Sequence, residues 1–96
     1  MGLDIYVKDV RRDELECISD DAEDSFGAMC RQAPETSLRR GVMQYGQTMF
    51  NSYQLRRFVE ELEALPPSEV TPKIQQVLDG ARLAIRKSGY LYFIGD

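Results

Sequence analysis

Apolar residues recur at helical spacing over positions 55–65, and they predict an amphipathic helix. Asn51 or Ser52 is the expected N-cap, because a short polar side chain there accepts a hydrogen bond from an otherwise free N–H group. The pair Pro66-Pro67 ends the helix, since the residue before a proline is pushed out of the helical region. The charged residues on the other faces are expected to remain in solvent: Arg56, Arg57, Glu60, Glu61 and Glu63.

A second helical stripe follows over positions 74–85. Thr71 is its predicted N-cap and Pro72 its first residue, where the missing proline N–H costs nothing. Gly89 stands where a left-handed C-cap is expected. Because the connection between the two helices is short, they are predicted to pack as an antiparallel hairpin.

Segments at both ends of the chain have the pattern of strands. Positions 3–8 alternate apolar and polar residues, which is typical of a half-buried strand. Positions 90–94 are aromatic and aliphatic, which also favours a strand. A third strand is expected over 42–45, between two glycines, because two strands alone are marginally stable. The predicted fold class is α+β: an antiparallel helical hairpin packed on a small sheet of about three strands that includes both chain termini.

The stretch between these segments is harder to assign. Ser19 is predicted to cap a helix that Pro34 ends, with acidic residues in its first turn. Gly27 weakens that helix by about 1 kcal/mol. The pattern over 14–18 fits a strand or a loop equally well. The inward-facing residues of this helix are expected to be Ala22, Phe26, Met29 and Ala33.

The length of 96 residues is enough for one domain with a thin core, so a single domain over residues 1–96 is expected. The composition, 43% hydrophobic and 29% charged, is that of an ordinary globular protein. The first residues lack the basic start and apolar run of a signal peptide, and the longest apolar run is too short to span a bilayer. The sequence therefore predicts a cytoplasmic protein with no membrane partner.

Acidic residues are concentrated in the first third of the chain. Residues 13–24 contain seven acidic residues and no basic one, whereas residues 36–96 contain six acidic and eight basic ones. The acids either form a solvated face that also serves a helix N-terminus, or dock a basic protein partner. Their spacing does not match a calcium-binding loop, so no metal site is expected. The candidate partner-binding residues are Asp13, Glu14, Glu16, Asp20, Asp21, Glu23 and Asp24.

The chain contains no histidine, which removes imidazole bases, Ser-His-Asp and Cys-His catalysis, and zinc sites with histidine ligands. It also lacks a phosphate-binding loop and a dinucleotide fingerprint, so no cofactor is expected. Cys17 and Cys30 are predicted to be reduced, partly buried thiols. Because these catalytic and cofactor-binding patterns are absent from the sequence, an enzyme is not the favoured interpretation. A ligand-binding domain or enzyme with Cys30, Tyr45, Tyr53 and arginines around a pocket is the alternative.

The last strand is either an interior strand or an exposed edge. An exposed edge would pair with its copy and join two chains in a homodimer. The edge residues would then be Tyr90, Tyr92 and Ile94. Nucleic acid is not an expected partner, because the pairs Arg39-Arg40 and Arg56-Arg57 are isolated in a chain with a pI near 4.8.

The second half carries two short motifs, Thr48-Met49-Phe50-Asn51-Ser52-Tyr53-Gln54 and Tyr92-Phe93-Ile94-Gly95-Asp96. With them the chain resembles a group of small uncharacterised bacterial proteins that share T-x-F-N-x-x-Q, two helices and a closing aromatic-F-I-G-D. The resemblance covers roughly half of the chain, from Thr48 onward. It implies a bacterial origin and a helix–helix–strand order, and it implies no activity and no site residue. Proteins of this kind are often immunity proteins or accessory binders.

These observations favour a protein that binds a basic protein partner through an acidic surface, in an immunity-type or regulatory role. Two alternatives stay open. The first is the ligand-binding domain or enzyme described above, and the second is an oligomeric structural subunit.

Overall fold

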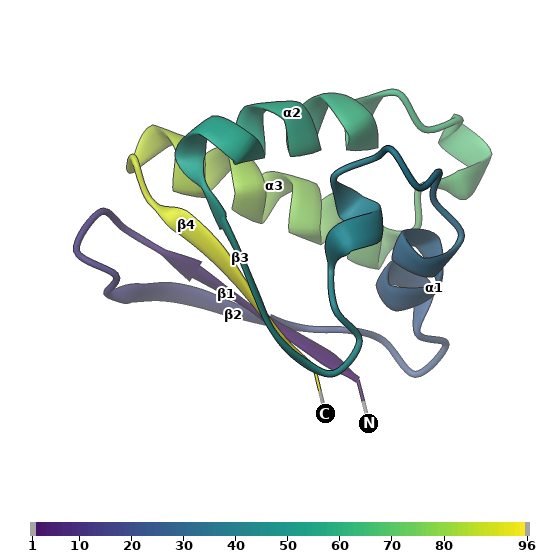
Figure 1. The fold of residues 1–96 in the computed structure, drawn as a ribbon, viewed down its shortest axis with the longest axis horizontal. Helices are drawn as coiled ribbons and strands as arrows, with labels where there is room; N and C mark the ends of the chain where they lie inside the picture. Colours follow the sequence, from purple (N-terminus) through teal and green to yellow (C-terminus); the bar gives the residue numbers. More distant parts are fainter. Residues whose placement is uncertain (1, 96) are drawn as a thin grey trace.

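A four-stranded antiparallel sheet forms one layer of the structure, a computed structural model that describes residues 2–95 (Figure 1). The strands follow one another in space in the order β2-β1-β4-β3. Consequently the first and last strands of the chain lie next to each other in the middle of the sheet. The predicted α+β class is confirmed, and the sheet has four strands where about three were expected. The strand bounds are β1 (Leu3–Lys8), β2 (Glu14–Ser19), β3 (Gly46–Asn51) and β4 (Tyr90–Gly95).

The third strand lies later in the chain than the predicted segment 42–45. That segment leaves the short 3-10 helix η1 (Arg39–Gly41) and buries Val42 in the core, so it packs rather than pairs. Gly46 then adopts φ 86°, a value that favours glycine, and starts β3. The prediction of a strand at 42–45 was therefore wrong: Val42 packs into the core, and the strand begins at the glycine.

Three helices cover one face of the sheet (Figure 1). They are α1 (Ser25–Arg31), α2 (Ser52–Glu63) and α3 (Pro72–Arg86), and a short 3-10 helix η2 (Pro67–Glu69) lies between the last two. Figure 1 shows α2 and α3 side by side and running in opposite directions. Within residues 2–95, no helix has the length and apolar character needed to cross a membrane.

The core lies between the helices and the covered face of the sheet. In β1 the side chains alternate between buried and half-buried, as the sequence pattern predicts. Four buried phenylalanines join the elements, with neighbouring ring centroids 5.2–6.4 Å apart. Each fully buried side chain of this size contributes about 1.5–3 kcal/mol to stability. These residues are Phe26 of α1, Phe50 of β3, Phe58 of α2 and Phe93 of β4.

The starts of α2 and α3 follow the sequence prediction. The Asn51 side chain accepts a hydrogen bond from the Gln54 N–H at 2.9 Å, and the Gln54 side chain accepts one from the Asn51 N–H at 3.0 Å. This reciprocal pair is a capping box. Thr71 caps α3 by accepting from the Ile74 N–H, and Pro72 is its first residue. Local sequence thus determines both helix starts.

Gly89 has a different role from the predicted left-handed C-cap. The left-handed residue is Ser88, with φ 52°. A Cβ added at Gly89 would lie 1.9 Å from the Lys8 carbonyl oxygen. A side chain is therefore excluded by the close approach of β1, where Tyr90 pairs with Lys8. The need for glycine at position 89 therefore arises from the pairing of β1 with β4 and not from the local sequence.

The first helix begins later than predicted. Ser19 is the last residue of β2 and pairs with Asp4, so the ambiguous segment is a strand and Ser19 does not cap a helix. Asp24 occupies the N-cap position in a left-handed conformation, with φ 57°. Phe26 is buried as expected, but Ala22 is exposed because it precedes the helix. The helix is short because the preceding residues belong to the sheet and its connection.

Candidate binding surface

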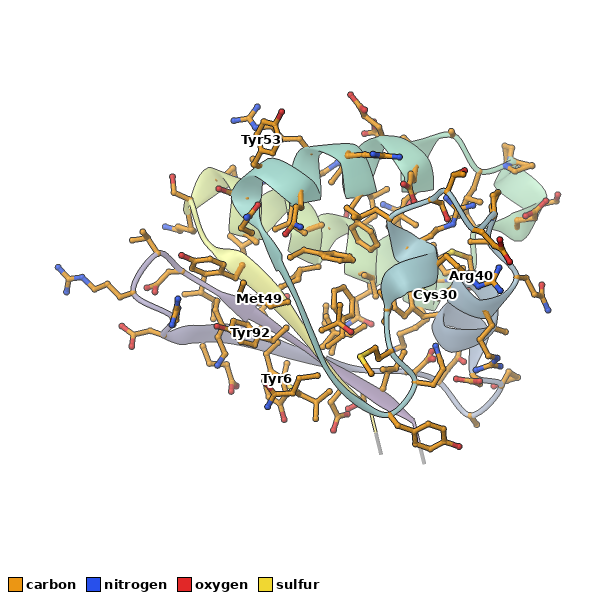
Figure 2. The ribbon with its side chains drawn as sticks, viewed as in Figure 1. Tyr6, Cys30, Arg40, Met49, Tyr53 and Tyr92 are labelled. Carbon is orange, nitrogen blue, oxygen red and sulfur yellow. The ribbon has the colours of Figure 1, made fainter. Side chains whose placement is uncertain are left out.

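The face of the sheet away from the helices is not covered by any element of residues 2–95 (Figure 1). Because strand side chains alternate, the residues between the buried positions of β1 and β4 project onto this face. Three of them are tyrosines, which we call the tyrosine face: Tyr6, Tyr90 and Tyr92. Figure 2 shows Tyr6 and Tyr92 on the side of the sheet opposite α2 and α3.

Two cations lie against the rings of the tyrosine face. Lys8 Nζ is 4.4 Å from the centroid of Tyr92, and the Arg12 guanidinium is 5.4 Å from that of Tyr90. The Tyr90 and Tyr92 rings meet edge to face, with centroids 6.3 Å apart. Such cation–π contacts contribute about 0.5–1 kcal/mol each at exposed sites. They favour the arrangement of Tyr90 and Tyr92 that the structure has.

Tyr6 lies beside the edge strand β2, opposite Cys17. The negative charge that Cys17 carries when ionised, followed by partial loss of solvent and by Asp4, raises the pKa of the Tyr6 phenol. The hydroxyl therefore stays protonated at neutral pH and is able to donate a hydrogen bond. Cys17 itself is exposed, which corrects the prediction that both thiols are partly buried.

Exposed acidic side chains lie along the edge strand β2 and the turn before it. Glu14 pairs with Lys8 at the irregularity in the β1–β2 ladder and so shares the tyrosine face, whereas Glu16 pairs with the buried Val7 and projects to the helix side of the sheet. We call Asp13, Glu14 and Glu16 the acidic edge. Residues 4–16 together contain five acidic and three basic residues, so the hairpin carries net negative charge. The acidic edge therefore lies next to the tyrosine face, at the border of the sheet.

The rest of the predicted acidic block has structural partners. The Asp20 carboxylate accepts hydrogen bonds from the backbone N–H groups of Phe26 at 3.1 Å and Gly27 at 2.9 Å. Burial raises the pKa of Asp20, and these two N–H donors oppose that rise. Asp20 thus satisfies the first free N–H groups of α1 from outside the helix.

Asp21 and Asp24 are also engaged at the start of α1. Asp21 accepts from both the hydroxyl and the backbone N–H of Ser25, and these bonds lower the pKa of Asp21. Asp24 forms an ion pair with Arg31 at 2.6 Å. A Cβ added at Gly27 would lie 2.4 Å from Asp24 Oδ1, so the glycine makes room for this arrangement.

The structure therefore divides the seven predicted partner-binding residues into two groups. Asp13, Glu14 and Glu16 are on the exposed hairpin and strand, whereas Asp20, Asp21 and Asp24 hold the start of α1. Glu23 is exposed in the connection between β2 and α1. The first group is available for a partner without cost to the fold. The second group serves a helix N-terminus, which is the other interpretation that the sequence left open.

The predicted oligomer edge is an interior strand. β4 pairs with β1 on one side and with β3 on the other. The backbone of Tyr90, Tyr92 and Ile94 therefore has no free edge to offer to a second copy, and the prediction was wrong in this respect. The edges of the sheet are β2 and β3. The sequence alone was insufficient because strand order depends on which segments meet across the sheet.

The residues of the predicted pocket do not converge. Cys30 is buried in α1, while Tyr45 and Tyr53 are exposed (Figure 2). Burial raises the pKa of the Cys30 thiol to about 12. This thiol therefore stays protonated at neutral pH, and a protonated buried thiol is a poor nucleophile. The arrangement does not support chemistry centred on Cys30.

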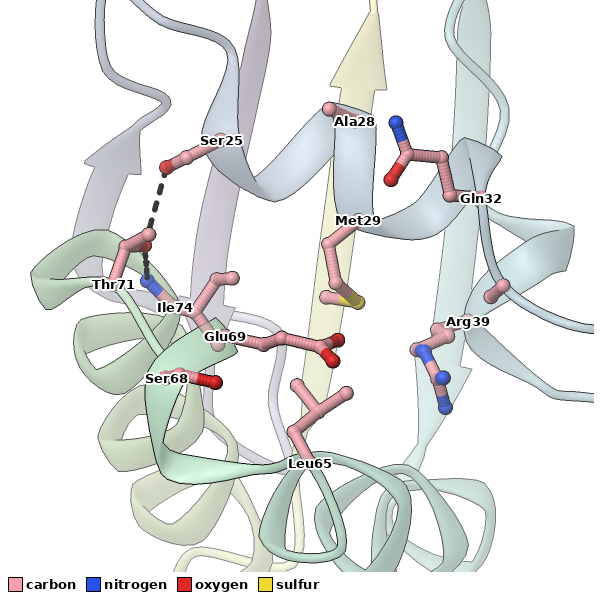
Figure 3. A pocket seen from close by; sticks show the side chains of 11 residues that line it. Ser25, Ala28, Met29, Gln32, Arg39, Leu65, Ser68, Glu69, Thr71 and Ile74 are labelled. Carbon is pink, nitrogen blue, oxygen red and sulfur yellow. Dashed lines mark hydrogen bonds between the residues drawn. The ribbon is translucent and has the colours of Figure 1, made fainter.

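A cavity of about 350 Å³ lies elsewhere, between α1, η2 and the start of α3 (Figure 3). Met29, Leu65 and Ile74 supply its apolar wall. Two of its polar groups already have partners within the protein: the Ser25 and Thr71 hydroxyls are 3.2 Å apart, and Thr71 also caps α3. Its other polar side chains include Arg39, whose Nε is buried without a partner, and Glu69.

Sequence reasoning missed the role of Glu61, which it placed on a solvated face. Its side chain is only 13% exposed. It accepts hydrogen bonds from the backbone N–H groups of Leu38 and Arg39 and pairs with the Arg39 guanidinium at 3.0 Å. The predicted pair with Arg57 is also present, at 3.7 Å. No local signal in the sequence marks Glu61, because its partners lie about twenty residues away.

Residues 2–95 contain no group of three acidic or cysteine side chains that is arranged to hold a metal ion.

The comparisons with known proteins gave no match: no family model, no curated protein and no solved structure is detectably similar to this chain. The class of protein that the structure itself defines is an α+β domain with helices on one face of a four-stranded sheet and tyrosines on the other. The tyrosine face is therefore the main candidate for a functional surface.

Proposed function

We propose that this protein binds a basic protein partner through the tyrosine face and the adjoining acidic edge, in an immunity-type or regulatory role. The observation that carries the proposal is the uncovered sheet face with three ordered tyrosines beside exposed acids. Tyrosine is enriched at protein interfaces because it offers a large apolar body with a polar tip. The acids supply the complementary field that steers a basic partner and orients it.

A protein partner fits this surface better than a nucleic acid. Tyrosines on a sheet also stack on unpaired bases, but such sites combine them with a positively charged groove. Here the hairpin has five acidic and three basic residues, and two of the basic ones already lie against the rings. A phosphate backbone would meet net negative charge, which opposes binding.

The proposal is tested by changing the acidic edge without touching the fold. The partner is first captured from the source cells at low and moderate salt and then purified, so that affinity is measured with two defined proteins. The triple variant Asp13→Asn, Glu14→Gln, Glu16→Gln is expected to lower the association rate about tenfold and to reduce its salt dependence. The matched control is Glu35→Gln, Glu60→Gln, Glu69→Gln, which removes the same charge from exposed positions elsewhere.

The tyrosine face is tested separately with Tyr92→Ala. Loss of a central aromatic anchor is expected to raise the dissociation constant about thirtyfold, mainly through faster dissociation. Circular dichroism and thermal melting establish that the variant is folded. Unchanged affinity in both the triple variant and Tyr92→Ala would overturn the proposal, as would equal loss in the triple variant and its control. Variants of Asp20, Asp21 and Asp24 are unsuitable here because they also disturb α1.

A further inference from the structure

The two edges of the sheet differ sharply in charge. β2 carries Glu14 and Glu16 and follows Asp13, whereas β3 has no charged residue. The uncharged stretch extends over residues 41–55. Charged side chains on an edge strand oppose pairing with another strand. By this criterion β2 is a protected edge and β3 is an open one.

Exposed apolar side chains gather around the open edge. Six large apolar side chains are exposed in residues 2–95, and four of them lie between positions 43 and 53. One lies in β3, two precede the strand and one is in the first turn of α2: Met49 at 41%, Met43 at 55%, Tyr45 at 67% and Tyr53 at 83% exposed. Methionine and tyrosine are among the residues enriched at protein interfaces. An unpaired strand edge and an apolar surface thus coincide.

We infer that β3 is the interface of a homodimer, in which the β3 strands of two copies pair antiparallel around a two-fold axis. The axis is perpendicular to the sheet, so the product is one continuous sheet of eight strands with all helices on the same face. This surface adjoins the tyrosine face, because Met49 pairs with Tyr92 across the β3–β4 ladder and projects to the same side of the sheet. The dimer would present two tyrosine faces on one side, whether or not the proposed partner exists.

A second copy is the occupant because the edge is self-complementary. In a two-fold pairing every residue meets a residue of the same segment, so a segment that carries charges of one sign would meet like charge. The absence of charge over residues 41–55 removes that penalty. The acidic edge would incur it in full, because Glu14 and Glu16 would face the same residues of the other copy.

The two ends of β3 also match each other. Antiparallel pairing brings the Gly46 end of one strand beside the Asn51 end of the other. Tyr45 immediately precedes the strand, so Tyr45 of each copy would lie beside the Asn51 end of the other strand, whereas Tyr53 belongs to the first turn of α2. The proposed dimer interface is therefore at β3, an edge strand, and not at the last strand, where the sequence predicted it.

Analytical ultracentrifugation over a range of concentrations tests the inference. The unmodified chain is expected to form a species of twice 11.0 kDa. The side chain at position 49 faces or diagonally neighbours position 49 of the other copy, because two-fold antiparallel pairing places residues of the same face opposite each other. Met49→Lys and Met49→Glu are each expected to raise the dimer dissociation constant at least tenfold, through like charge and lost apolar contact.

Mixing the two variants tests directly whether position 49 lies in the interface. Met49→Lys with Met49→Glu is expected to restore a dimer that contains one chain of each kind, because opposite charges then meet. Leu15→Lys, on the acidic edge, is the matched control and is expected to dimerise like the unmodified chain. A monomer of the unmodified chain at all concentrations up to hundreds of micromolar would overturn the inference. A dimer that persists in both Met49 variants, or that Leu15→Lys dissociates, would overturn it as well.

Discussion

Cys17 and Cys30 have the same side chain but different surroundings in the fold. Cys17 is exposed on β2 beside Tyr6, whereas Cys30 is buried in α1. Burial penalises the charged thiolate, and this raises the pKa of Cys30 to about 12, with the nearby Arg39 acting in the opposite direction. Cys30 is therefore a small apolar packing residue rather than a reactive one.

The shifted pKa of Cys30 predicts a loss of stability at alkaline pH. The thiol of the unfolded chain ionises near pH 9, while that of the folded protein stays protonated up to about pH 12. Unfolding then releases a proton between these values, so the free energy of unfolding falls by up to about 1.4 kcal/mol per pH unit. Urea denaturation between pH 8 and 10.5 is expected to show a shallower decline for Cys30→Ala. Parallel curves would contradict the prediction.

At the scale of elements, Glu61 connects α2 to η1. One carboxylate holds two backbone N–H groups at the start of η1 and the guanidinium of Arg39. Arg39 Nε is buried without a partner, so the Glu61 contact is the main compensation for a largely buried cation. Glu61 thus helps to position the turn that carries Val42 into the core.

Removal of this carboxylate is expected to be costly. Glu61→Ala should lower the free energy of unfolding by about 3 kcal/mol, because it leaves two N–H groups and a mostly buried guanidinium unpaired. Chemical denaturation gives the value. Glu60→Ala is the control, since Glu60 is an exposed neighbour on the same helix and should change stability by less than about 0.5 kcal/mol. Similar values for the two variants would show that the Glu61 contacts do not hold η1.

At the scale of the molecule, the first and last strands of the chain pair with each other. β1 and β4 pair along their full length in the middle of the sheet, and the other two strands flank them. The most buried side chains of the sheet belong to these central strands. The pairing of the first strand with the last therefore joins segments that are separated by almost the whole sequence.

This arrangement predicts the order of amide hydrogen exchange. The N–H groups of β1 and β4 are bonded within the interior of the sheet and are expected to exchange slowest, near the rate set by global unfolding. Those of β2, an edge with mostly exposed side chains, are expected to exchange at least tenfold faster. Exchange followed by NMR gives both rates in one experiment. Protection of β2 equal to that of β4 would contradict this assignment of stability.

Much of the local structure was predictable from the sequence. The helix caps at Asn51 and Thr71 and the alternation in β1 depend on residues within a few positions of each other, and all were confirmed. The start of β3, the place of β4 in the sheet and the function of Asp20 were not predictable. The first two depend on segments that are distant in sequence, and the third on a helix that starts five residues later than Asp20.

The sequence by itself therefore determined the class of fold, the helices of the second half and the acidic character of the first third. Tertiary structure alone decided that Gly89 must admit the Lys8 carbonyl, that Glu61 holds η1 and that three tyrosines share an uncovered face. The physical reason is the range of the interactions. Capping and periodicity act over a few residues, whereas strand order and close approach exist only after distant segments have met.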